Sequence, residues 1–432
     1  MTESLTDERA HAAGNWRLSA WCVVAAFGAY FCMYGFRQPY TVASYEEPWW
    51  WGMKAKDLLV IAQVLGYTLS KFIGIKVIAE MPPPRRIAWL LGLIASAQAA
   101  LLLFALTPSP YRIVWLFVNG LPLGMVFGLV MSFLEGRRHT EALTAGLCTS
   151  FIVADGVTKS IGQELLSRDV SEWWMPVTAG LLFAPALLFF TWMLSRIPAP
   201  SAADVAARSR RAPMNGAERW QFFRRYAFGL TLLVLVYLLV SVLRSIRSYF
   251  APEIWRGLGI ENTPSVFTQS EIPVGLGVLF LGGLAVCIRD NRRAFYAAMA
   301  LALVGTMLLG AALLGFRAGM LSPLAFMVLH GLGVFLPYVV FHTTVFERLI
   351  ALTRDRGNIG YLMYLADAFG YLGVVCVLLA KNLFAPPSDF LDFFVAATWI
   401  VTGACVVGLI PCWRYFAVRP APQAVVAATA DA

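Results

Sequence analysis

Long apolar runs recur throughout this 432-residue chain, and they limit what it can fold into. A helix that crosses a bilayer needs about 20 predominantly apolar residues. The composition agrees with membrane spans, since 59% of the residues are hydrophobic and only 14% are charged. We therefore expect an all-α integral membrane protein with twelve transmembrane helices. The runs are 17–45, 57–80, 87–107, 112–134, 142–165, 174–196, 226–250, 266–288, 293–315, 322–346, 358–383 and 389–413.

Basic residues in the short loops predict how these helices are oriented, because cytoplasmic loops are enriched in Lys and Arg. Basic clusters such as Arg85–Arg86 and Arg292–Arg293 alternate with acidic loops such as Glu46–Glu47. This pattern places both termini in the cytoplasm, and we expect a multi-pass protein of the cell (inner) membrane. The net charge of +9 is dispersed between the apolar runs, so we expect the lipid bilayer and no nucleic acid as a partner.

Charged landmarks recur at similar offsets in the two halves of the chain. Arg37 and Arg244 lie 207 positions apart, and Asp155 and Asp367 lie 212 positions apart. A duplicated six-helix unit, with its two copies related by an axis along the membrane normal, explains these offsets, as in major facilitator transporters. In such a fold the transport site lies near the midplane, between the halves.

The longest polar loop divides the runs six and six. It is rich in Ala, Ser and Arg and contains two prolines, which is typical of a linker. We expect an N-terminal six-helix half over 1–197, a cytoplasmic linker over 198–225, a C-terminal half over 226–415 and a cytoplasmic tail over 416–432.

Two arginines interrupt apolar runs, Arg37 in FGAYFCMYGFRQPY and Arg244 in LLVSVLRSIRSYFAP. An arginine at the centre of a membrane helix costs about 2.5–3.5 kcal/mol on an insertion scale, so it usually faces a cavity or a partner. A guanidinium stays charged at physiological pH, and its planar fork suits phosphate or carboxylate. We expect the two arginines to face each other across a central anion site. The alternative is that each side chain reaches the outer interface.

Three motifs around these arginines resemble the organophosphate:inorganic phosphate antiporters, a major facilitator branch that includes the glycerol-3-phosphate and hexose-phosphate transporters. The resemblance implies that Arg37 and Arg244 clamp a substrate phosphate with Lys71 close by, and that the substrate is exchanged for inorganic phosphate. The matching residues are Tyr30, Tyr34, Arg37 and Tyr40 in the first run, Tyr67, Ser70, Lys71 and Phe72 in the second, and Val242, Leu243, Arg244 and Pro252 in the seventh.

The chain also departs from the pattern of that family. Gln38 stands where the family commonly has a basic residue, and Arg247 is additional. The fifth run has Asp155 and Lys159 in place of a histidine. The charges around the two arginines therefore differ from those of the family.

Other charged residues inside the runs are candidates for ion pairs or for coupling. Asp155 and Lys159 are four positions apart and can neutralise each other on one helical face, or take a substrate or proton role. Lys71 could pair with Asp155 or with Asp367 rather than with substrate, and Asp367 could pair with Lys71 or Arg244 or carry a proton. Glu271 precedes a proline, so either a broken helix exposes it or the helix starts later.

Two further groups of polar residues lie near the ends of the runs or inside them. At the cytoplasmic ends we expect salt bridges that steady the closed state, formed by Glu135 and Arg137 in one half and by Glu347 and Arg348 in the other. His330 and His342, in the tenth run, fit packing or cavity-lining roles, although a histidine can also sense pH.

Together these features predict a secondary active transporter of a small organic anion, an organophosphate exchanged for inorganic phosphate by alternating access. The substrate-binding residues would be Arg37, Arg244, Lys71 and Arg247, which supply positive charge, and Tyr30, Tyr34 and Tyr67, which donate hydrogen bonds.

Two alternatives stay open: a proton-coupled carboxylate or organic-anion transporter, and a non-transporting membrane sensor of a phosphorylated solute. The sequence shows no phosphate-binding GxxxxGK[ST] loop, no nucleophile–base set and no metal-ligand cluster. We therefore expect no enzyme activity, no cofactor and no metal, and we expect a monomer.

Overall fold

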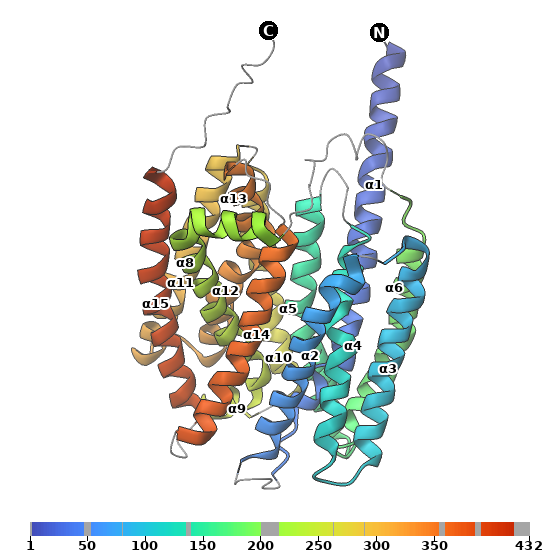
Figure 1. Cartoon of the computed structure of the whole chain (residues 1–432). Coiled ribbons are helices and arrows are strands. Elements are labelled where there is room, and N and C mark those ends of the chain that lie inside the picture. Colours follow the sequence, from blue (N-terminus) through green and yellow to red (C-terminus); the bar gives the residue numbers. More distant parts are fainter. Residues whose placement is uncertain are drawn as a thin grey trace.

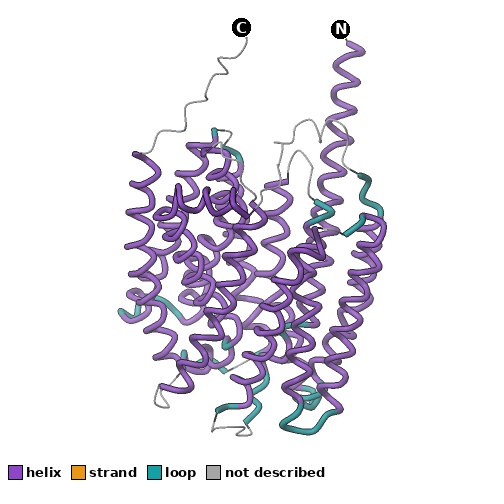
Figure 2. The backbone as a smooth tube through the Cα atoms, in the orientation of Figure 1, coloured by secondary structure: helices purple, strands orange, loops and turns teal. Residues whose placement is uncertain are grey.

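The computed structural model describes residues 2–46, 53–79, 81–134, 140–199, 216–261, 263–288, 290–353, 359–384 and 390–418. Long helices run side by side through these ranges as a single bundle (Figure 1), joined by short loops (Figure 2). The start of α1 and the end of α15 lie at the same end of the bundle, at the top of Figure 1. We call the opposite end of the bundle the distal end.

The first six-helix half, at the right of Figure 1, begins with a helix that stops early. Its elements are α1 (Thr2–Met33), the 3₁₀ turns η1 (Tyr34–Phe36) and η2 (Pro39–Val42), α2 (Ala55–Ala79), the 3₁₀ turn η4 (Pro83–Arg85), α3 (Arg86–Leu106), α4 (Arg112–Met131), α5 (Thr140–Ser167) and α6 (Met175–Ser195).

The second half, at the left of Figure 1, includes a short helix at the distal end and a π-helical turn. Its elements are α8 (Gly216–Tyr249), α9 (Ala251–Gly257), α10 (Pro264–Val286), α11 (Asn291–Arg317), α12 (Pro323–Val340), the π-turn η5 (Phe341–Val345), α13 (Phe346–Thr353), α14 (Ile359–Phe384) and α15 (Phe390–Val418).

Every apolar run of the sequence corresponds to one long helix of this bundle, which confirms the expected twelve-helix membrane fold. Ten of the spans in the described ranges are long and apolar enough to cross a membrane by their own composition. The other two long helices are α5 and α14, which carry buried charges such as Asp155 and Asp367. These two helices lie against the opposite half, α5 against α10 and α14 against α2.

The first helix ends earlier than its apolar run. The run continues to residue 45, but α1 stops at Met33, and the chain continues as two 3₁₀ turns with Arg37 between them. A proline at position 39 agrees with the break, because it has no N–H to donate to a carbonyl of the preceding turn. The carbonyl of Arg37 accepts a hydrogen bond from Gln63 Nε2 on α2 at 3.1 Å.

The second half also starts at a different residue from the one that the sequence predicts. Helix α8 begins at Gly216, inside the expected linker, and non-helical dihedral angles at Tyr226 mark the place where the membrane run was expected to start. Residues 200–215 of that linker lie outside the described ranges.

Close helix contacts fix the positions of the side chains near the centre of the bundle. A Cβ atom on Gly66 of α2 would lie 2.1 Å from the carbonyl oxygen of Phe117 on α4, and one on Gly120 of α4 would lie 2.3 Å from the carbonyl oxygen of Gln63. Small residues allow membrane helices to approach this closely. On α5, a Cβ atom on Gly156 would lie 2.6 Å from the carbonyl oxygen of Phe267, so α5 and α10 are also in close contact where the two halves meet.

Two ion pairs join the halves at the distal end. Lys56 on α2 lies 2.5 Å from Glu253 on α9, and Asp57 on α2 lies 3.4 Å from Lys381 on α14. Around these pairs lies an open pocket of about 510 Å³, to which both halves contribute. The ion pairs therefore hold the halves together at the distal end in this conformation.

We expect a charge reversal at Lys56 to destabilise the protein. The Lys56 side chain is only 4% exposed, and breaking a buried ion pair costs about 3–5 kcal/mol. Lys56→Glu should therefore lower the melting temperature in detergent, and the double variant Lys56→Glu/Glu253→Lys should recover most of the loss.

The matched control is Arg168→Glu, which reverses the charge in an exposed ion pair. The Arg168 side chain is 72% exposed and its partner Glu164 is 45% exposed, so we expect a change of about 1 kcal/mol or less. Equal effects of the Lys56 and Arg168 reversals would show that the distal pair does not hold the halves together.

Candidate functional site

Two arginines lie buried near the middle of the bundle. Arg37 follows the 3₁₀ turn after α1, and Arg244 lies within α8. Their exposed fractions are 3% and 7%. Neither guanidinium therefore reaches the outer interface, which excludes the alternative that these side chains snorkel.

Tyrosine side chains surround Arg37. Its Nη2 atom donates a hydrogen bond to the hydroxyl of Tyr249 at 2.7 Å, and its guanidinium lies 4.1 Å from the ring centroid of Tyr67. The Nε atom is buried without a hydrogen-bond partner. In the described part of the chain, no carboxylate forms an ion pair with Arg37.

Arg244 has a similar environment. Its guanidinium lies 4.4 Å from the ring centroid of Tyr338, and its Nη2 atom lies 3.5 Å from the hydroxyl of Tyr371. Its Nε atom is also buried without a hydrogen-bond partner. Among the residues that the structure describes, Arg244 too has no carboxylate partner.

A tyrosine pair connects the surroundings of the two arginines. The rings of Tyr67 and Tyr371 lie 4.8 Å apart, with Tyr67 against Arg37 and Tyr371 against Arg244. Tyr67 comes from α2 of the first half and Tyr371 from α14 of the second. Two aromatic rings, one from each half, thus connect the surroundings of Arg37 with those of Arg244.

A small cavity lies beside this tyrosine pair. It measures about 10 Å³, which is room for about one water molecule. In this conformation the cavity is therefore too small for an anion the size of phosphate. The lining residues are Tyr30, Tyr34, Tyr67, Lys71, Phe127, Phe151, Arg244, Tyr338, His342, Asp367 and Tyr371.

Lys71 and Asp367 form an ion pair across this cavity, from α2 to α14. The Nζ atom of Lys71 lies 3.1 Å from Oδ2 of Asp367. The other carboxylate oxygen accepts a hydrogen bond from the Tyr237 hydroxyl and lies 3.3 Å from Nε2 of His342. The sequence left Asp155 and Asp367 as possible partners of Lys71, and in the structure the partner is Asp367.

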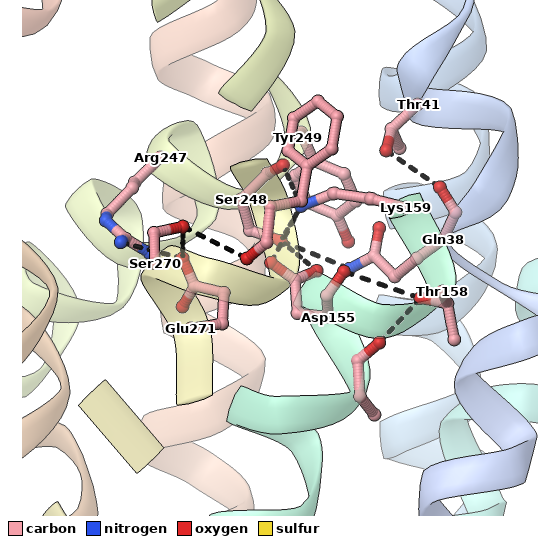
Figure 3. A network of polar contacts seen from close by, with 12 residues as sticks. Gln38, Thr41, Asp155, Thr158, Lys159, Arg247, Ser248, Tyr249, Ser270 and Glu271 are labelled. Atoms are coloured by element: carbon pink, nitrogen blue, oxygen red, sulfur yellow. Dashed lines mark hydrogen bonds and ion pairs between the residues drawn. The ribbon is translucent and has the colours of Figure 1, made fainter. Parts of the chain in front are cut away.

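Asp155 and Lys159 form the expected pair on α5, at 2.7 Å. The pair also bonds to the other half, because Ser248 of α8 donates to Asp155 Oδ1 at 2.8 Å and its carbonyl accepts from Lys159. Gln38 donates to the same serine hydroxyl at 3.2 Å. Figure 3 shows this polar network between the halves.

Arg247 lies in a different environment from Arg244. It forms an ion pair with Glu271 of α10 at 2.8 Å (Figure 3). It also donates to the carbonyl of Met327 at 3.0 Å. Neither expectation for Glu271 holds, since α10 runs unbroken through Pro273 and begins at Pro264, before the glutamate. Arg247 is absent from the lining of the central cavity, so its charge serves the pair rather than the cavity.

The expected cytoplasmic gate is only partly within the described ranges. Glu135 and Arg137 lie outside them. Arg348 donates to Asn291 of α11 at 2.6 Å, within its own half, and Glu347 lies on α13. The gate therefore stays a prediction.

Several residues near the arginines were not singled out from the sequence. Tyr237 lies seven positions before Arg244, on the same helical face, and this spacing is a signal that could have identified it. Tyr338 precedes His342 by four positions, which is a similar signal. Tyr249 lies five positions after Arg244 and meets Arg37 only through packing of the halves, so the sequence gives no local signal for it.

Comparison with solved structures relates this arrangement to known transporters. The crystal structure of a D-xylose–proton symporter matches with a TM-score of 0.60 and 13% sequence identity, over 93% of this chain and 97% of that one. The chain therefore has the same fold as that symporter, which is the expected major facilitator fold.

Two further comparisons concern the sequence itself. A search of curated proteins gives no match. A family model described as "Family of unknown function (DUF5690)" matches residues 39–419, which is most of the chain, and the protein therefore belongs to that family.

Proposed function

We propose that this protein moves a small organic anion across the cell membrane by alternating access, and that the anion carries a phosphate group exchanged for inorganic phosphate. The observation that carries this proposal is the pair of buried arginines, Arg37 and Arg244, which have no carboxylate partner among the residues that the structure describes. Leaving a buried charge uncompensated is costly. A bound anion would supply the missing charge.

The other buried cations of the centre differ from these two arginines, because each of them has an acidic partner. Lys71, Lys159 and Arg247 each form an ion pair with an acid. Within the described ranges, these three cations and the two arginines thus face three carboxylates, Asp155, Glu271 and Asp367, which leaves two positive charges. A phosphate monoester carries about −1.5 to −2 charges near pH 7, so it would neutralise the site.

The chemistry of the surrounding side chains also suits phosphate. Each guanidinium can offer two parallel N–H donors to phosphate oxygens. Tyr30, Tyr34 and Tyr67 line the cavity and can donate hydrogen bonds through their hydroxyls. Lys71 would add a point charge if it left Asp367. We include Arg37, Arg244, Lys71 and these tyrosines in the proposed site, and we leave out Arg247 because Glu271 already neutralises it.

Alternating access would require the contacts between the two halves to open and close. For the anion to reach both arginines, the contact between Tyr67 and Tyr371 must open, together with the Lys71–Asp367 pair. The distal ion pairs would close one mouth while the opposite mouth is open. We propose that the two six-helix halves rock about this site, with both termini in the cytoplasm.

Proton-coupled transport of a carboxylate is the second candidate. The observation in its favour is Asp367, a buried carboxylate in the cavity that contacts His342 and Tyr237. The fold shared with a D-xylose–proton symporter also supports this candidate.

Exchange of radiolabelled phosphate into proteoliposomes preloaded with phosphate tests the proposal. We expect saturable exchange by the wild-type protein and no exchange above background by Arg37→Ala, because the anion would lose one of its two guanidinium partners. A folded wild-type protein that does not exchange phosphate would contradict this function. Carboxylate uptake under a proton gradient would then be measured.

The planar geometry of the guanidinium group predicts that lysine cannot fully replace either arginine. Arg37→Lys and Arg244→Lys keep the charge but lose the planar fork, so each should weaken phosphate binding at least about tenfold, which corresponds to about 1.4 kcal/mol. Binding to the purified variants can be measured by calorimetry.

The matched control is Arg317→Lys at the exposed end of α11, which should bind phosphate as the wild type does. Wild-type affinity in both central variants would rule out the arginine clamp.

A further inference from the structure

The Asp367 carboxylate links a lysine of one half to a histidine of the other. Its Oδ2 atom lies 3.1 Å from Lys71 Nζ, and its Oδ1 atom lies 3.3 Å from His342 Nε2. The Tyr237 hydroxyl donates to the same Oδ1 and lies 2.6 Å from the imidazole. All four side chains are buried.

His342 occupies an unusual position for a residue that only packs. It lies in the π-turn η5, between α12 and α13, and single π-turns in helices often mark functional sites. Its Nδ1 atom is buried without a hydrogen-bond partner in the described part of the chain, and the side chain lines the central cavity. The imidazole thus has a free nitrogen beside the cavity, and imidazole is the side chain suited to exchange protons near neutral pH.

An anion in the cavity would compete with Asp367 for Lys71, because Lys71 and Arg244 both line that space. If Lys71 turned to the anion, Asp367 would keep only neutral donors. An unpaired carboxylate in a buried site is costly. A proton on the neighbouring imidazole would restore a cation beside the carboxylate.

Arg244 strengthens this competition. It lines the same cavity as His342, and its positive charge opposes a second cation nearby. An anion bound to Arg244 would cancel that charge and so favour protonation of the histidine. The anion would therefore act in two ways, by withdrawing Lys71 and by neutralising Arg244.

We propose that His342, Asp367 and Tyr237 form a proton-acceptor site that is coupled to anion binding through Lys71. This inference rests on the proposed function, because it concerns the same cavity. One proton passes from water to the imidazole as the anion binds, the imidazolium takes the place of Lys71 beside Asp367, and the proton returns to water when the anion leaves.

Other charged and titratable groups lie on the helices that pack around His342. Helix α10 brings Glu271, which is paired with Arg247, and α11 has charged residues only near its two ends. The groups that share the cavity or contact its members are Tyr30 and Tyr34 of α1, Tyr67 and Lys71 of α2, Cys148 of α5, Tyr237 and Arg244 of α8, Tyr338 of α12, Glu347 and Arg348 of α13, and Asp367 and Tyr371 of α14.

Calorimetry of phosphate binding near pH 7, in two buffers that differ in ionisation enthalpy, measures how many protons are exchanged per bound phosphate. Phosphate itself exchanges protons in this range, so the same ligand is compared across variants. We expect His342→Gln to take up about one proton fewer per phosphate than the wild type. By proton linkage, its affinity should change less steeply with pH, by up to about tenfold per pH unit.

The chain offers a matched control, His330→Gln. His330 is a buried histidine of the preceding helix α12 that lies 3.1 Å from Thr398 and is absent from the cavity lining. It should keep the wild-type proton number. A purely structural role of His342 would lower the affinity at every pH without changing that number.

Each outcome has a separate meaning. Phosphate binding with equal proton numbers in the wild type and His342→Gln would overturn the proton site and leave the proposed function intact. No phosphate binding by the folded wild type would overturn the proposed function and the proton site together. If His342→Gln does not fold, Lys71→Gln provides the test. In that variant Asp367 has no lysine partner with or without the anion, so proton uptake on phosphate binding should be lost. Proton uptake at the wild-type level would overturn the proposal.

Discussion

The cost of burying charge in an apolar bundle governs how this protein is built. An isolated ion transferred from water to a protein interior loses several kcal/mol or more of solvation, so a buried charge is normally paired. Here Lys159 and Arg247 have acids as partners, at 2.7 and 2.8 Å. Arg37 and Arg244 have tyrosines instead. Among the described residues, the exception to charge pairing therefore lies at these two arginines, where we propose that the anion binds.

The positions of the paired charges indicate which contacts can change. The Lys71–Asp367 pair joins α2 to α14, and two more pairs join the halves at the distal end. The Arg247–Glu271 pair instead joins α8 to α10 within one half. Buried ion pairs add little net stability but select one geometry over others. Pairs between the halves can thus specify a closed arrangement without making it too stable to open, whereas the pair inside a half can stay formed throughout.

Much of the fold could be predicted from the sequence, because each apolar run is long enough to span a membrane and polar loops separate the runs. The break after Met33 was missed because apolar residues continue past it, although Pro39 was a visible signal. The contacts within the candidate site were harder to predict. The sequence identified Lys71 and Asp367 as buried charges, but the choice between two acids for Lys71 depends on a contact between residues 296 positions apart. The partner of Glu271 could not be predicted either, because it depends on the packing of α8 against its neighbours.

In the proposed anion site, tyrosines suit the two arginines better than acids would. A carboxylate beside each arginine would form a charge-assisted bond that an incoming anion must break, and it would repel that anion. A cation–π contact is worth about 0.5–2 kcal/mol, and a single hydrogen bond to a charged group is worth about 1.5–3 kcal/mol. The contacts that hold Arg37 and Arg244 in this conformation are therefore weaker than the bidentate bonds that a phosphate can offer. Lys71 differs, because its resting partner is a full carboxylate. In the coupling that we propose, an anion that displaces Lys71 leaves Asp367 in need of a replacement charge, and His342 is the neighbour that would provide it.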